Sequence, residues 1–162
     1  MTFPQFGRLY FVIVGHRDQP LFEFEALKHD DSTSSIPLQR EDYRHLCQFV
    51  VHAALDAVEA SLVGPQGSQM FFKNVDRFNE WSVSAFVTSS LIKFVLLHPV
   101  RDDSQSAMRK EESDIIRNFF YAVYEIYMKL ALNPFYELDS EISSRGFREK
   151  LHQLVKKHLL NL

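Results

Sequence analysis

The sequence predicts an α+β fold in which helices cover both faces of a five-stranded antiparallel sheet. Residues 8–15 and 91–98 are apolar without polar alternation, which is typical of central strands covered on both sides. Three strand-like segments follow one another with short turns, which indicates an antiparallel meander. Segments with helical apolar spacing complete the order ββαβββαα, the order of an α-β-α sandwich.

The chain begins with a predicted β-hairpin. Its first strand, residues 8–15, is β-branched and aromatic, and its second strand is 21–27. The second strand alternates between apolar and acidic side chains, in the order Phe22, Glu23, Phe24, Glu25 and Ala26. Alternation is typical of a strand with one exposed face, so this strand is expected nearer an edge of the sheet. Residues 28–41 are polar and predict a flexible loop.

A helix is predicted over residues 42–62. Asp42 is its expected N-cap, because a short acidic side chain accepts hydrogen bonds from the first free N–H groups of a helix. Gly64 and Pro65 supply the matching stop, since proline cannot continue a helix. The three strands of the meander then follow, over residues 69–78, 81–89 and 91–98.

The remaining segments predict a loop and two helices. Residues 99–112 are charged and poor in large apolar side chains, which indicates a second flexible loop. A long helix over 113–132 ends before Asn133-Pro134, and Ser143 or Ser144 caps the last helix. The predicted sheet-facing stripes are Ile116, Phe119, Phe120, Val123, Ile126, Tyr127 and Leu130 in the long helix, and Phe147, Leu151, Leu154, Val155 and His158 in the last one.

Composition excludes several classes of protein. A chain of 162 residues predicts one domain, 1–162, and a single cysteine cannot form an internal disulfide bond. A net charge of −3 argues against a nucleic-acid binder with a generally basic surface. The longest strictly apolar run, Leu9–Val14, is far shorter than the roughly 20 residues of a membrane span. We therefore expect a cytosolic protein with no direct membrane insertion.

No motif in the sequence indicates catalysis, a cofactor or a metal. Phosphate-binding glycine loops, paired metal-binding histidines on a helix and the serine-hydrolase elbow are all missing. Cys47 has apolar neighbours, which favours an inert buried thiol. His52 and Asp56 are four residues apart, but two ligands on one helix are weak grounds for a metal site. Glu23 and Glu25 are explained by strand alternation. We expect a protein that is not an enzyme.

The predicted helix at 42–62 has more apolar surface than one sheet can cover. One apolar stripe comprises Leu46, Phe49, Val50, Ala53 and Ala57; a second comprises Cys47, Val51, Ala54, Leu55, Val58 and Leu62. A helix that lies on a sheet needs only one such stripe. We expect the second stripe, through Val51, Leu55 and Val58, to contact another protein, with His52, Asp56 and Glu59 beside it. The alternatives are that the polar loops 28–41 or 99–112 cover this stripe, and that Asp56 is a solvated carboxylate.

Several separate segments, in this order along the chain, carry a resemblance to a known family. They are Tyr10–His16, Phe49–Asp56, Val75–Trp81, Val83–Thr88, Asn118–Phe120, Val123–Tyr124, Asn133–Glu137 and Lys156–Leu160. Together they resemble the sedlin family, small subunits of the TRAPP vesicle-tethering complex, nearly from end to end. The resemblance implies the longin (SNARE-like) fold, with one helix on one face of a five-stranded sheet and two on the other.

The resemblance also implies a function. It implies a non-catalytic adaptor in ER-to-Golgi and Golgi transport. Such an adaptor joins the TRAPP core to larger accessory subunits, and the core promotes nucleotide exchange on a Rab GTPase. Asp56 matches an aspartate on the first helix of the family that looks like a partner-contact position, with His52 as its neighbour. The implied location is cytoplasmic, at ER-Golgi and Golgi membranes through the complex. The alternative is a longin module that regulates a SNARE, which the end of the chain at Leu162 without a heptad segment disfavours.

Overall fold

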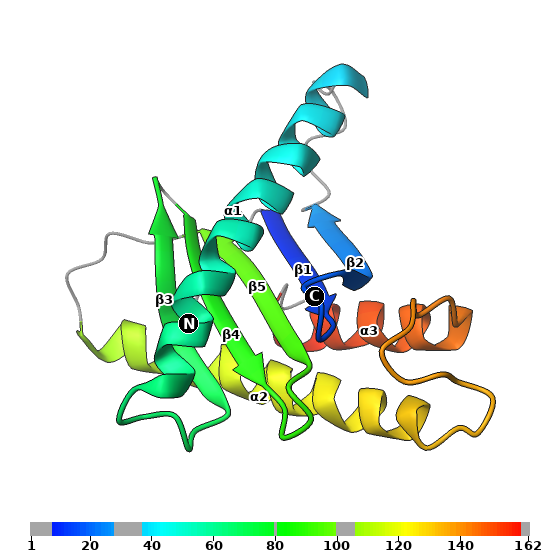
Figure 1. Cartoon of the computed structure of the whole chain (residues 1–162). Coiled ribbons are helices and arrows are strands. Elements are labelled where there is room, and N and C mark those ends of the chain that lie inside the picture. The colour runs from blue at the N-terminus through cyan, green and yellow to red at the C-terminus, as the bar shows by residue number, and fades with distance from the viewer. Residues whose placement is uncertain (1–7, 28–36, 80, 100–105, 160–162) are drawn as a thin grey trace.

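The computed structural model describes residues 8–27, 37–79, 81–99 and 106–159 (Figure 1). Its elements are β1 (Arg8–Val14), β2 (Pro20–Leu27), α1 (Pro37–Val63), β3 (Phe71–Phe78), β4 (Trp81–Val87), β5 (Lys93–Pro99), α2 (Ser106–Ala131) and α3 (Arg145–His158). This is the predicted order ββαβββαα. The fold is therefore α+β, as the element order predicted, and longin-like, as the resemblance implied.

The five strands form one antiparallel sheet in the order β2-β1-β5-β4-β3. The two strands predicted to be central, β1 and β5, lie side by side, and Phe11 pairs with Leu96 between them. The alternating strand β2 lies at an edge, as predicted. The meander β3-β4-β5 is confirmed as well.

Helices cover both faces of the sheet. Figure 1 shows α1 crossing in front of the strands, while α2 and α3 lie on the opposite side. The alternation of β1 explains this arrangement, because its even and odd positions enter different cores. Tyr10, Val12 and Val14 pack under α1, whereas Leu9, Phe11 and Ile13 pack with α2 and α3.

Phenylalanine side chains fill the core under α2. Phe86 stacks on Phe94 with 5.8 Å between ring centroids, and on Phe120 at 5.9 Å. Phe11 meets Phe119 edge-on at 5.7 Å. Each such pair contributes about 0.5–1.5 kcal/mol beyond the burial of its area. Much of the high phenylalanine content, 15 residues, therefore serves internal packing.

Two of the three described helices, α1 and α2, begin earlier than the sequence predicted. α1 begins at Pro37, so Asp42 lies inside the helix and the N-cap prediction is wrong. α2 begins at Ser106, inside the segment predicted as the loop 99–112. Both starts are polar but rich in good helix formers, and polarity alone does not indicate a loop. The rest of the two predicted loops, 28–36 and 100–105, lies outside the described residues.

The helix ends agree better with the sequence. Ser144 caps α3, because its Oγ accepts a hydrogen bond from the Phe147 N–H at 3.3 Å. α2 ends at Ala131, just before Asn133-Pro134, and α1 ends at Val63, just before Gly64. The predicted core stripes of both C-terminal helices face the sheet, with Phe119, Phe120 and Leu151 completely buried.

Candidate protein interface on helix α1

The residues predicted to contact a partner through the second apolar stripe are buried inside this chain. Val51 and Leu55 are 4% exposed and Val58 is 0% exposed. Val51 and Leu55 pack on β1 and β5, and Val58 packs on Phe72 of β3. The prediction that these three side chains form a docking surface is therefore wrong. Periodicity reveals two apolar stripes on a helix, but it does not say which one the sheet covers.

The surplus apolar surface of α1 exists, but it lies on the other side of the helix. Leu46 is 43% exposed, Phe49 is 65% exposed and Val63 is 89% exposed. Ala53 and Ala60 are exposed between them. We call the row Leu46, Phe49, Ala53, Asp56, Ala60 and Val63 the outer stripe of α1. Its members follow one another at steps of three and four residues, so they lie on one face of the helix.

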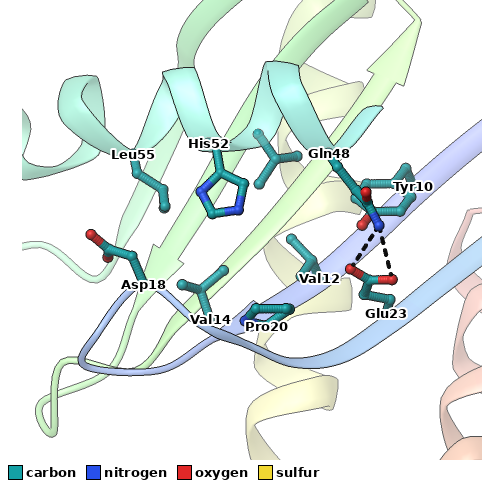
Figure 2. A pocket seen from close by; sticks show the side chains of 10 residues that line it. Tyr10, Val12, Val14, Asp18, Pro20, Glu23, Gln48, His52 and Leu55 are labelled. Carbon is teal, nitrogen blue, oxygen red and sulfur yellow. Dashed lines mark hydrogen bonds between the residues drawn. The ribbon is translucent and has the colours of Figure 1, made fainter. Parts of the chain in front are cut away.

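Asp56 lies in the outer stripe, and His52 lies beside it. Both side chains are exposed, on turns of α1 whose opposite side packs on the sheet. Among the described residues, Asp56 makes no ion pair. His52 lines a shallow crevice between α1 and the β1–β2 hairpin (Figure 2). The two side chains predicted at the edge of an interface are thus accessible, and their contact with a partner stays a prediction.

Glu59 has a partner within the chain. Its Oε1 accepts a hydrogen bond from Lys93 Nζ at 3.3 Å, and Asp18 Oδ1 accepts another at 3.1 Å. The Lys93 side chain is only 7% exposed, whereas both carboxylates are partly in water. A buried ammonium needs such partners, because removal of a charge from water costs several kcal/mol. Glu59 therefore helps to hold α1 on β5 and on the β1–β2 turn. Sequence reasoning missed Lys93, although a single lysine in an otherwise apolar strand was a visible signal.

A second polar contact joins the other half of α1 to the hairpin. Arg44 Nη2 donates to Glu23 Oε2 at 2.7 Å. Gln48 Nε2 donates to Glu23 Oε1 at 3.2 Å, as Figure 2 shows. The hydrogen bond to Glu23 raises the pKa of Arg44. Burial raises the pKa of Tyr10, which lies next to Glu23, and the carboxylate raises it further. Glu23 was predicted to face outward, but it faces α1.

The crevice between these two contacts is too small for a cofactor. It is lined by Val12, Val14, Pro20, His52 and Leu55, among others, and its volume is about 20 Å³. That space accommodates about one water molecule. Figure 2 shows His52 at its rim, with the side chain of Leu55 alongside. The crevice is therefore a seam between α1 and the hairpin rather than a binding pocket.

Ser84, His98 and Glu112 form a polar cluster that the sequence analysis missed. Ser84 Oγ lies 3.0 Å from His98 Nε2, and His98 Nδ1 lies 3.6 Å from Glu112 Oε1. Serine, histidine and acid in this order also occur in hydrolases, where the serine oxygen must reach a substrate. Here Ser84 is completely buried and His98 is nearly so. Burial lowers the pKa of His98 to about 4, so the imidazole is neutral at pH 7. The cluster packs α2 against β4 and β5.

The described residues offer no metal site and no reactive thiol. No group of three or more histidine, cysteine, aspartate or glutamate side chains among them could hold a metal ion. Cys47 is buried among the residues under α1, as its neighbours in the sequence indicated.

Part of α1, Glu41–Val63, is long and apolar enough to cross a membrane by length and composition alone. It is the one helix of this kind among the described residues. Both apolar stripes raise the mean hydropathy of this segment, although one of them forms the core over the sheet. The core helix of a folded domain passes the same test. We therefore interpret α1 as a core helix with an exposed apolar side.

Comparisons with known proteins give a consistent assignment. Residues 13–157 match the family model described as Sedlin. A probable trafficking protein particle complex subunit 2 from Caenorhabditis elegans is 43% identical over 150 residues, which cover 93% of this chain and 95% of the relative. A protein of the same description from Drosophila melanogaster is 40% identical, with 94% and 97% covered. The transport protein particle 20 kDa subunit of Schizosaccharomyces pombe is 31% identical, with 93% and 98% covered.

Proposed function

Because the chain belongs to the sedlin family, we propose that it is a subunit of the TRAPP vesicle-tethering complex in ER-to-Golgi and Golgi transport. In this proposal it is a non-catalytic adaptor that joins the TRAPP core to larger accessory subunits through α1. Its link to a Rab GTPase is indirect, through the core. It is cytoplasmic and reaches secretory membranes through the complex rather than by insertion.

The observation that carries the proposed adaptor role is the outer stripe of α1. Leu46, Phe49 and Val63 expose large apolar side chains along one face of a helix whose other face is core. Complete burial of such a side chain contributes about 1.5–3 kcal/mol, of which the isolated chain gains only a part at these positions. Exposed large apolar side chains along one helix face are typical of protein interfaces. Asp56, within the stripe, adds a charge that a matching partner would recognise.

The burial of Ser84 and His98 supports the non-enzymatic part of the proposal. Ser84 and His98 have the spacing of a nucleophile and its base, but neither is accessible. The crevice beside His52 holds about one water molecule. An adaptor needs exposed, rigid surface instead, and α1 provides it.

The proposal is tested by reconstitution with TRAPP subunits from the same organism. Phe49→Ser removes the largest exposed side chain of the outer stripe, and Phe135→Ser is its matched control, since Phe135 is exposed in the segment between α2 and α3. We expect Phe49→Ser to weaken accessory-subunit binding about tenfold or more, as for a central apolar contact. Phe135→Ser should bind as the unmodified chain does, and circular dichroism should show both variants folded.

Three results would contradict the proposal in different ways. Equal binding by both variants would refute the role of α1 while leaving membership in the complex intact. Failure of the unmodified chain to join any TRAPP subunit in size-exclusion chromatography would refute membership. Tight binding of a purified SNARE helix under the same conditions, without any TRAPP subunit, would favour a regulatory longin module instead.

A further inference from the structure

We infer that the segment that docks on the outer stripe of α1 is itself an amphipathic helix, with basic side chains opposite Asp42 and Asp56. The inference rests on the proposed function, because it specifies the chemistry of the partner at the same site. It is carried by three features of the described helix: the spacing of the stripe, the size of its side chains and the positions of two exposed carboxylates.

The spacing of the outer stripe is that of a helix–helix contact. Its residues recur at steps of 3, 4, 3, 4 and 3 along the chain, the a and d positions of a heptad repeat. From Leu46 to Val63 the stripe extends about 26 Å at 1.5 Å per residue. A straight row of this length fits the side of a second helix. In Figure 1, the first turns of α1 extend past the strands.

The side chains alternate in size in a way that favours close packing of helices. Ala53 and Ala60 are small and exposed, and they leave room for side chains of a partner. Leu46, Phe49 and Val63 are large and project on either side of them. Small positions between large ones form the holes into which the knobs of a neighbouring helix insert. An extended segment would instead need the free edge of a sheet for its backbone hydrogen bonds.

The exposed carboxylates of α1 favour a partner helix with basic side chains. Asp42 occupies the stripe position one step before Leu46, and Asp56 lies 14 residues later, about 21 Å along the axis. Both are exposed, and neither forms an ion pair with a described residue, unlike Glu23 and Glu59. Docking of a helix would desolvate these carboxylates, which costs free energy unless a lysine or arginine faces each one. Exposed aspartates that pair with no described residue also disfavour an anionic lipid surface as the occupant.

Crosslinking in the reconstituted complex tests the inference. A photoreactive phenylalanine analogue is placed at position 53 or at position 60 of the full chain, and at position 121 as a control on the exposed side of α2. The complex is assembled with TRAPP subunits, irradiated and mapped by mass spectrometry. For a helical partner, the products from 53 and 60 should lie about seven residues apart in one continuous segment of a single subunit.

The mapped segment then allows a charge swap. Asp56→Lys should weaken binding roughly 30-fold or more, and acidic replacement of the basic partner residue nearest position 56 should restore most of the affinity. Asp42→Lys should weaken binding in the same way. Acidic replacement of a second basic residue, about 14 positions from the first in that segment, should restore its affinity. Restoration by the swap would be specific to pairing, since a merely misfolded variant would not recover.

The other outcomes separate this inference from the proposed function. Crosslinks to an accessory subunit in two unconnected segments, or at neighbouring residues of an extended strand, would overturn the helical partner and leave the adaptor role supported. A stable complex without crosslinks from positions 53 and 60 would overturn both the helical partner and the role of α1. Failure of the complex to form would overturn the proposed function itself, and the inference with it.

Discussion

Lys93 Nζ lies 3.3 Å from Glu59 Oε1, and this contact joins the central strand of the sheet to α1. The same ammonium lies 3.1 Å from Asp18 Oδ1 in the β1–β2 turn. Three elements that are distant in the sequence therefore meet at one buried charge. The contact is asymmetric, because the lysine is buried and both carboxylates are partly exposed. This asymmetry determines what substitutions at the site should do.

We predict that loss of the two carboxylates destabilises the fold more than loss of the lysine. Lys93→Met replaces a buried charge by an apolar side chain of similar length and should change the free energy of unfolding by only about 1 kcal/mol. Asp18→Ala combined with Glu59→Ala leaves the ammonium buried without partners and should cost about 3 kcal/mol. Urea denaturation measures both. A larger loss in Lys93→Met would show that the ion pairs themselves stabilise the chain.

We predict that Val58→Asp unfolds the isolated chain rather than disrupting a complex alone. Val58 is completely buried over β3 and β4, so an aspartate there places an unpaired charge in the core. The expected loss is about 3 kcal/mol or more. Ala60→Asp is the control, since it lies two residues later on the exposed side and should change stability by only about 0.5 kcal/mol. Equal melting temperatures for both variants would contradict the assignment of Val58 to the core.

We predict that Asp56→Tyr keeps the fold and loses partner binding. Asp56 is exposed and makes no ion pair with another described residue, so its replacement should change stability by only about 0.5 kcal/mol. A pull-down with accessory subunits and a thermal melt on the same preparation check both parts. Unchanged binding would contradict the interface role, and a strongly lowered melting temperature would indicate a structural role.

We predict that His98 makes the fold less stable in acid. Burial lowers its pKa to about 4 in the folded chain, against about 6.5 in the unfolded chain. The unfolded chain therefore binds more protons between these values, and stability is complete above pH 6.5 and decreases as the pH falls toward 4. The expected loss is on the order of 3 kcal/mol. Urea denaturation at pH 7 and pH 4.5 measures it, and His98→Gln should reduce the difference. An unreduced difference would assign the acid sensitivity to other groups.

Much of the fold could be predicted because its elements have simple periodicities. β1 and β5 are apolar on both faces, and their central position follows from that pattern alone. The starts of α1 and α2 could not be predicted in the same way, since their first turns are polar and carry no apolar stripe. A polar segment that is a good helix former and a polar loop look alike in a single sequence.

The candidate site was predicted only in part, and the reason is physical. The sequence indicated that α1 has apolar surface on two sides, but not which side the sheet would take. The side of α1 with the β-branched Val51 and Val58 packs on the sheet, while the larger Phe49 is exposed to solvent. Lys93 and His98 were missed because their partners come from other elements and converge only in the folded chain.

The contacts of Glu23 and Lys93 at the two halves of α1 have a thermodynamic consequence for binding. Arg44 and Gln48 fasten one half of the helix to β2, and Glu59 fastens the other half to β5. The outer stripe of α1 is thus held in place before any partner binds. Binding therefore orders few groups of this chain, and we expect α1 to dock as a rigid body. Most of the conformational entropy lost on binding is then lost by the partner.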